Sequence, residues 1–237
     1  MPQPSGTPVF QFENVTKIYR KGAMETHALR GMNHTVHSGE FVAIWGPSGS
    51  GKTTALNLGG ALDTPTSGTI RLEGVDLATL SRKALSRLRR DRIGFVFQAY
   101  NLIPVLTAFE NAEAVLALQG VAASERRDRV MQLLKDVGLA GMEHRRPNEL
   151  SGGQQQRVAI ARAIASNPAV ILADEPTANV DSETAEKLLT IMARLNEERG
   201  ITFVFSTHDP RVMKYARRLV GMVDGAIATD EVKASGE

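Results

Sequence analysis

The sequence predicts an α/β domain built on a mainly parallel sheet that helices cover on both faces. Short apolar runs of strand length alternate along the chain with stretches of helical periodicity. One of these runs ends in a glycine-rich loop, and another ends in two consecutive acidic residues. The 237 residues, 42% of them hydrophobic, are enough to bury a core of this kind.

The expected elements follow one another in a regular order. An alternating pattern starts at Val9 and places Phe10 and Phe12 on one strand face. Strands are expected at residues 41–45, 68–72, 93–97, 170–173 and 202–205. Helices are expected at 82–92, 107–118, 123–137 and about 182–198, and an Asp-Gly turn predicts a hairpin over 222–227.

These elements predict one domain over residues 9–230, between a disordered lead at 1–8 and a tail at 231–237. The stretch 100–165 is expected to form a purely helical lobe.

The composition excludes several classes of protein. Lys and Arg number 28 against 26 Asp and Glu, and this near balance argues against a dedicated nucleic-acid binder. No apolar stretch approaches the roughly 18 residues of a membrane helix, and residues 1–12 lack the pattern of a secretory signal. The absence of cysteine excludes disulfides and fits a reducing compartment, so we expect a soluble cytosolic domain.

The glycine-rich loop matches G-x-x-x-x-G-K-[ST] at every fixed position. Its residues are Gly46, Pro47, Ser48, Gly49, Ser50, Gly51, Lys52 and Thr53. Glycines let successive N–H groups point at an anion, and the following helix adds the positive end of its dipole. Lys52 supplies a charge for the outer phosphates, and Thr53 offers a hydroxyl to Mg²⁺. A chance Gly/Ser-rich turn is disfavoured because a strand precedes the motif and a helix follows it.

The acidic pair Asp174 and Glu175 follows the apolar run 170–173. Carboxyl ends of parallel strands share one edge of the sheet, where ligands bind, so the pair is expected near the glycine-rich loop. We expect Asp174 to hold Mg²⁺, directly or through water, and Glu175 to polarise the attacking water as general base. The alternative is a strand that ends in solvated acids, which the phosphate loop makes less favourable.

A second helix start lies at residues 150–154. Ser151 can be the N-cap and Gln154 its partner in a capping box. Gly152 and Gly153 argue against an ordinary helix start, because two glycines cost helix stability. They indicate that backbone approaches something closely, and a helix start favours a phosphate. The sequence therefore suggests a composite site that another subunit completes.

Taken together and in this order, the motifs resemble those of an ATP-binding cassette (ABC) nucleotide-binding subunit, over about residues 9–230. The resemblance implies a P-loop NTPase fold with a RecA-like core, an antiparallel β subdomain and an α-helical subdomain. It implies ATP and Mg²⁺ as cofactors and a head-to-tail dimer. In that dimer, Ser151, Gly152, Gly153 and Gln154 of one copy reach the nucleotide held by the other.

The resemblance also assigns roles to residues that would otherwise be unremarkable surface or packed side chains. Tyr19 matches the aromatic residue that stacks on adenine, and Thr54 extends the phosphate-binding loop. Gln98 matches the glutamine that touches Mg²⁺ and the attacking water and senses the permease. His208 matches the histidine that contacts the γ-phosphate, and Asp181 lies in the loop that crosses the dimer interface.

The departures from the family pattern are small. Ala178 and Val180 stand where close relatives usually have Gly and Leu, which leaves the packing of that loop open. Thr53 replaces the commoner Ser and keeps the hydroxyl.

Several segments are similar to those of the MacB/LolD/FtsE-like group, namely 46–52, 62–68, 92–98, 101–104 and 106–111. This implies integral membrane permease subunits as partners, no nucleic acid, and a peripheral position on the cytoplasmic face of the inner membrane. In that group, closure of the ATPase dimer moves a periplasmic part of the permease, an action called mechanotransmission. The resemblance leaves open whether a periplasmic or outer-membrane adaptor is a further partner. The basic stretch 82–92 faces lipid headgroups or the permease in one interpretation, and only solvent in the other.

Three functions remain to be compared. The first is a transporter ATPase for export, lipoprotein release or efflux, and the second is an FtsE-like regulator of cell-wall hydrolysis that transports nothing. The sequence does not separate these two. The third, a soluble ABC ATPase acting on DNA or ribosomes, is disfavoured. Only 151 − 46 = 105 residues separate the two glycine motifs, without sustained heptads, and the chain has a single cassette.

Overall fold

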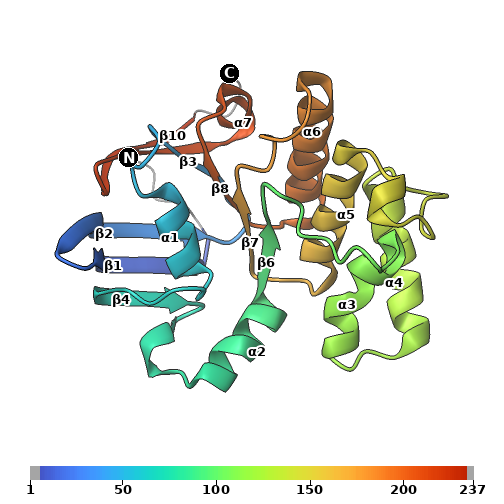
Figure 1. Ribbon diagram of the computed structural model, residues 1–237, viewed down its shortest axis with the longest axis horizontal. Helices are drawn as coiled ribbons and strands as arrows, with labels where there is room; N and C mark the ends of the chain where they lie inside the picture. The colour runs from blue at the N-terminus through green and yellow to red at the C-terminus, as the bar shows by residue number, and fades with distance from the viewer. Residues whose placement is uncertain (1–5, 234–237) are drawn as a thin grey trace.

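The computed structural model describes residues 6–233, in which two sheets are combined with helices (Figure 1). The strands are β1 (Pro8–Lys21), β2 (Met24–His37), β3 (Phe41–Trp45), β4 (Ser67–Leu72), β5 (Val75–Asp76), β6 (Ile93–Val96), β7 (Val170–Asp174), β8 (Phe203–Thr207), β9 (Arg218–Val223) and β10 (Ala226–Val232). The α-helices are α1 (Lys52–Gly59), α2 (Arg82–Arg92), α3 (Ala108–Leu118), α4 (Ala123–Asp136), α5 (Gly152–Ala165), α6 (Ser182–Arg199) and α7 (Pro210–Tyr215). Two 3-10 turns are η1 (Leu77–Thr79) and η2 (Pro147–Glu149).

The larger sheet has the strand order β10-β9-β3-β8-β7-β6. All neighbours pair in parallel except β10, which is antiparallel to β9. Strand β3 shows why the apolar runs are continuous: Val42 and Ile44 pack on the α1 side, and Phe41 and Ala43 pack on the side of α5 and α6. Burial on both faces leaves no position for a polar residue. This confirms the predicted α/β class.

The smaller sheet is antiparallel, with the order β2-β1-β4-β5. Figure 1 places it on one side of the larger sheet and helices α3 to α6 on the other. Side chains of α1, among them Leu56 and Leu58, share one buried cluster with Phe10 and Phe12 of β1 and with β3. Helix α1 therefore lies between the two sheets.

Strand β2 is not predicted by the sequence pattern. Its pairing with β1 is interrupted by shifts of register, and Gly31 has a φ of 77°. Buried Leu29 and Met32 are consequently three residues apart, and the next buried position before Val36 is occupied by a polar residue, His34. Helix α7 is likewise absent from the prediction, and Trp45, expected inside a buried run, is 38% exposed.

The expected helical lobe is only partly separate from the sheet. Helices α3, α4 and α5 pack on one another, but α5 also packs directly against β6. A Cβ at Gly94 of β6 would lie 2.5 Å from the carbonyl oxygen of Ala163 in α5, so only glycine fits there. The last helix of the stretch 100–165 thus covers the main sheet.

The chain ends differ slightly from the expected bounds. Strand β1 begins at Pro8 and β10 ends at Val232, so strands extend one and two residues beyond 9–230. Residues 1–5 of the expected lead and 234–237 of the expected tail lie outside the described residues. Within residues 6–233, no helix combines the length and apolar character needed to cross a membrane.

An arginine on β9 joins the two sheets at one end. Arg218 donates two hydrogen bonds to Asp230 on β10, of 2.8 and 2.7 Å, and another of 2.8 Å to the carbonyl of Thr35 on β2. Burial would raise the pKa of the Asp230 carboxyl, but Arg218 and the nearby His34 outweigh it. They hold that pKa far below its usual range.

We expect Asp230→Asn to destabilise the protein in a pH-dependent way. The folded-state pKa lies below the unfolded value of about 3.9, so the carboxylate's contribution is complete above that value and is lost as the pH falls toward the folded pKa. Urea unfolding at a series of pH values should show a constant deficit from about pH 7 to pH 5 that shrinks below about pH 4. Glu231→Gln, an exposed neighbour, is the control. A deficit that persists unchanged down to pH 3 would contradict this role.

Candidate functional site

A cleft of about 630 Å³ lies where the glycine-rich loop, both sheets and the ends of β6, β7 and β8 meet. Its lining residues are Tyr19, Thr26, His27, Ala28, Ser48, Gly49, Gly51, Lys52, Thr53, Thr54, Gln98, Glu175 and His208. The structure thus brings the predicted phosphate loop together with the predicted aromatic residue, glutamine, glutamate and histidine. Thr26, His27 and Ala28 were missed, because they belong to β2.

The loop between β3 and α1 admits only glycine at two points. Gly46 and Gly51 have φ angles of 151° and 100°. A Cβ at Gly46 would lie 2.2 Å from the carbonyl oxygen of Met222, and one at Gly51 would lie 2.4 Å from that of Ala28. The chain therefore curls tightly between the two sheets, as the loop motif predicts.

The start of α1 is suited to an anion. Its N-cap residue, Gly51, provides no side-chain hydrogen bond to the first turn, so the helix N–H groups are free of a cap. Lys52 is buried, and its Nζ donates to the carbonyls of Gly46 and Pro47 at 2.8 and 2.9 Å. The buried hydroxyl of Ser50 has no hydrogen-bond partner within residues 6–233. A buried cation and an unpaired donor beside free N–H groups favour a phosphate.

Two oxygen groups that fit Mg²⁺ face each other beside the loop. The Thr53 hydroxyl lies 3.1 Å from Oδ1 of Asp174, which ends β7. Gln98 lines the same cleft. Hydroxyl, carboxylate and amide oxygens are the hard donors that Mg²⁺ prefers, usually completed by water and phosphate. The donor set therefore fits the ion that the sequence predicts.

Glu175 lies directly after β7 and is held on several sides. Its backbone N–H donates to the carbonyl of Ser206 on β8 at 2.9 Å, and its φ is 45°. Its Oε1 lies 2.7 Å from Nδ1 of His208, and its Oε2 accepts a hydrogen bond from Thr207 at 3.3 Å. Left-handed backbone at a non-glycine residue costs about 1–3 kcal/mol and occurs where the surroundings fix it. The carboxylate thus lines the cleft with its orientation fixed by hydrogen bonds, an arrangement that a general base would need.

The predicted capping box is present at the start of α5. Ser151 Oγ accepts from the N–H of Gln154 at 3.3 Å, and the Ser151 N–H donates to Gln154 Oε1 at 2.9 Å. The close approach inferred from the two glycines occurs within the chain. A Cβ at Gly153 would lie 2.2 Å from Cγ2 of Thr184, and one at Gly152 would lie 2.7 Å from the hydroxyl of Tyr100.

The structure does not place residues 151–154 in the cleft of their own chain. Asp181 is also outside it, where its side chain caps α6 by accepting from the N–H of Thr184 at 2.9 Å. The loop before α6 is nevertheless tied to the cleft, because Asn179 Nδ2 donates to the carbonyl of Gln98 at 3.0 Å. The predicted residues therefore form two groups, one lining the cleft and one on a separate surface.

Comparison with known proteins connects both groups to one family. The family model described as ABC transporter matches residues 29–178. The lipoprotein-releasing system ATP-binding protein LolD of Anaeromyxobacter dehalogenans is 47% identical over 231 residues, which cover 97% of each chain. The macrolide export ATP-binding/permease protein MacB of Azoarcus sp. is 45% identical over 226 residues, 95% of this chain but 34% of that protein.

A solved structure is similar in fold as well as in sequence. The ATP-binding cassette MJ0796, a protein of Methanocaldococcus jannaschii, was solved as a dimer in a post-hydrolysis state bound to ADP and Pi. It is 46% identical to this chain, covers 94% of it and 98% of its own chain, and superposes with a TM-score of 0.86.

We expect Lys52→Ala to weaken binding of ADP by about 10- to 100-fold, the loss typical for hydrogen bonds from a charged donor. Isothermal titration calorimetry measures the change directly. Lys83→Ala removes the same charge from an exposed position on α2 and should leave the affinity unchanged. Normal ADP affinity in Lys52→Ala would place the phosphates elsewhere.

Proposed function

The chain belongs to the ABC transporter family of ATP-binding proteins, and from that premise we propose that it drives a separate membrane permease of the MacB, LolCE or FtsX-like type by mechanotransmission. It is an ATPase subunit that binds ATP, dimerises and acts with a membrane partner. The residue roles below, the Mg²⁺ ion and the kind of permease belong to the proposal.

The pairing of Glu175 with His208 carries the hydrolytic part of the proposal. A carboxylate fixed at the end of a buried strand, 2.7 Å from an imidazole, lines the same cleft as the phosphate-loop lysine. Glu175 accepts a proton from a water whose oxygen attacks the γ-phosphorus, and the bond to the β–γ bridging oxygen breaks to give ADP and phosphate. His208 orients the carboxylate and contacts the γ-phosphate.

The other cleft residues bind and orient. Lys52 and the N–H groups of the loop, residues 46–54, hold the phosphates, and Tyr19 stacks on adenine. Thr53, Asp174 and Gln98 would hold Mg²⁺, which when bound supplies positive charge against the phosphate oxygens.

The second group of predicted residues acts on the nucleotide of a partner copy. Ser151, Gly152 and Gly153 start a helix on a surface separate from the cleft, where a helix N-terminus can meet a γ-phosphate. In a head-to-tail dimer this surface faces the partner's cleft, with Gln154 and Asp181 beside the boundary. The similar cassette MJ0796 was solved as a dimer, which supports dimerisation as part of this proposal.

The permease determines location and cargo. We place the subunit on the cytoplasmic face of the inner membrane, held there by permease subunits, with a periplasmic or outer-membrane adaptor as an additional partner in some systems of this type. The chain matches LolD along 97% of the length of that protein. It matches MacB, an ATP-binding/permease protein, along 34% of its length. These relatives favour a transporter or extraction system over a soluble ABC ATPase.

We expect Glu175→Gln to bind ATP normally and hydrolyse it about 10²- to 10⁴-fold more slowly, because the proton acceptor is lost while the binding groups remain. The variant should accumulate as a closed dimer with ATP, which size-exclusion chromatography with light scattering detects. Glu198→Gln makes the same change on the exposed face of α6 and should keep the normal rate. An unimpaired turnover rate in Glu175→Gln would contradict the assignment of the base.

We expect tagged Glu175→Gln protein, incubated with ATP in gently solubilised membranes, to retain permease subunits with a large extracytoplasmic domain. The trapped dimer keeps the permease-bound state populated, whereas Lys52→Ala, which binds nucleotide poorly, should retain fewer of these subunits. Mass spectrometry identifies the retained chains. Recovery of ribosomes, DNA or no membrane protein would contradict the transporter role, while the assignment as an ATPase would stand.

A further inference from the structure

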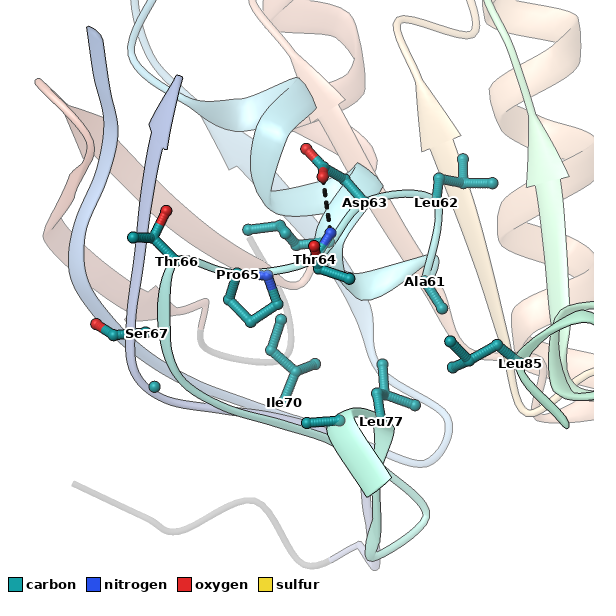
Figure 2. A pocket seen from close by; sticks show the side chains of 13 residues that line it. Ala61, Leu62, Asp63, Thr64, Pro65, Thr66, Ser67, Ile70, Leu77 and Leu85 are labelled. Atoms are coloured by element: carbon teal, nitrogen blue, oxygen red, sulfur yellow. Dashed lines mark hydrogen bonds between the residues drawn. The ribbon is translucent and has the colours of Figure 1, made fainter. Parts of the chain in front are cut away.

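The hydroxyl of Tyr19 is held by a carboxylate in the segment 62–68, to which no role has been assigned so far. It donates to Oδ2 of Asp63 at 2.9 Å. The other oxygen of Asp63, Oδ1, accepts from Nζ of Lys17 at 2.6 Å and from the N–H of Thr64 at 2.7 Å. Figure 2 shows Asp63 with the last of these bonds, on the segment that also borders a cavity of about 500 Å³. One carboxylate therefore collects three donors.

Asp63 stands on a well-fixed turn after α1. The N–H of Leu62 donates to the carbonyl of Asn57 at 2.9 Å, and Arg89 of α2 donates to the carbonyl of Ala61 at 2.7 Å. Helix α1 spans eight residues, or about 12 Å, from the phosphate loop to this turn. The carboxylate is consequently attached to the same rigid element as the phosphate-binding groups.

Tyr19 and Lys17 come from the other sheet, on β1. Lys17 is buried and its Nζ lies 4.8 Å from the centre of the Tyr19 ring. Tyr19 is 41% exposed and lines the cleft. A ring that has a cation over one face offers its other face to a planar group, so its orientation decides where a base can stack.

The charges of the cluster are consistent with these hydrogen bonds. Burial alone would raise the pKa of the Asp63 carboxyl, but hydrogen bonds from Lys17, Thr64 and Tyr19 lower it below its usual value. Burial and the hydrogen bond to Asp63 raise the pKa of the Tyr19 phenol. At neutral pH the carboxylate is therefore ionised and the phenol is a donor.

We propose that Asp63 is a positioning residue for the nucleobase. By holding the Tyr19 hydroxyl and the Lys17 ammonium, it fixes the ring at a set distance from the phosphate loop and so determines affinity for the base portion of the nucleotide. This rests on the proposed role of Tyr19 in stacking. The hydroxyl itself points to Asp63 and needs no contact with the nucleotide.

The test compares a ligand that has a base with one that has none. We use ADP and inorganic tripolyphosphate, measured by calorimetry on the full chain. Asp63→Ala should weaken the binding of ADP about 3- to 10-fold, which corresponds to the net contribution of a typical hydrogen bond. The affinity for tripolyphosphate should be unchanged. Equal weakening of both ligands would overturn the proposal, because it would place the effect on the loop or the fold.

A double-mutant cycle separates positioning from an independent effect. Tyr19→Phe keeps the ring and removes only the hydroxyl, so it should reproduce the base-dependent loss, even if Asp63→Ala folds poorly. Adding Asp63→Ala to Tyr19→Phe should cost less than Asp63→Ala costs alone, since the shared hydrogen bond is already gone. Fully additive losses would overturn the proposal.

Two further variants make the outcome specific. Asp76→Ala removes a carboxylate that caps η1 by accepting from the N–H of Ala78 at 2.9 Å, next to Leu77 and Ala78 of the same cavity. It should leave the affinity for both ligands unchanged. Tyr19→Ala tests the stacking role itself. If Tyr19→Ala leaves ADP affinity unchanged, the proposed stacking fails. If it weakens ADP while Asp63→Ala and Tyr19→Phe do not, only the anchoring role fails.

Discussion

The tight passage of the chain from β3 into α1 constrains everything around it. At Gly46 the backbone lies against the carbonyl of Met222 in the large sheet, and at Gly51 it lies against that of Ala28 in the small sheet. A single loop therefore fixes the distance between the two sheets while it turns its N–H groups inward. Because glycine is required at both contacts, the residues that we propose cradle phosphate also bring the two sheets into close contact. Binding and architecture thus depend on one backbone conformation.

The parallel order of the strands places the proposed catalytic residues at the same edge of the sheet as that loop. Strands β3, β8 and β7 are neighbours, so their carboxyl ends bring the loop, His208 and Glu175 to one edge. Glu175 keeps a φ of 45° because its N–H is bonded to Ser206 on the next strand and its carboxylate to His208. The strain is local, and the sheet that imposes it is buried on both faces. A carboxylate held this way, which we propose is the general base, has little freedom to turn away from the cleft.

The sequence predicts those parts of the site that depend on neighbouring residues and misses those that depend on distant ones. Buried strands, the phosphate loop and the capping box at Ser151 have local patterns, and all are present. Strand β2 is missed because its bulges break the period of two. The cleft residues that it contributes, Thr26, His27 and Ala28, are therefore missed as well. The two glycines at the start of α5 are explained by Thr184 and Tyr100, not by an external ligand alone. The hydrogen bonds of Asp63 could not be predicted, because its partner Lys17 is 46 positions away in the sequence.

The start of α5 lies outside the cleft, but hydrogen bonds connect this helix to the backbone segment that contains Gln98. Backbone carbonyls after β6 accept hydrogen bonds from side chains of α5 and of the loop before α6: Gln156 to Phe97 at 3.3 Å, Asn179 to Gln98 at 3.0 Å, and Arg162 to Tyr100 and Asn101 at 3.0 and 2.6 Å. Tyr100 and Asn101 both have positive φ, so side-chain bonds from α5 stabilise a strained turn two residues beyond Gln98. The helix that begins at Ser151 therefore cannot shift without disturbing the backbone of Gln98. The start of α5, where we propose a contact with the partner's nucleotide, and the backbone on both sides of Gln98 are thus parts of one hydrogen-bonded unit. The proposed site shared between two copies requires such a connection.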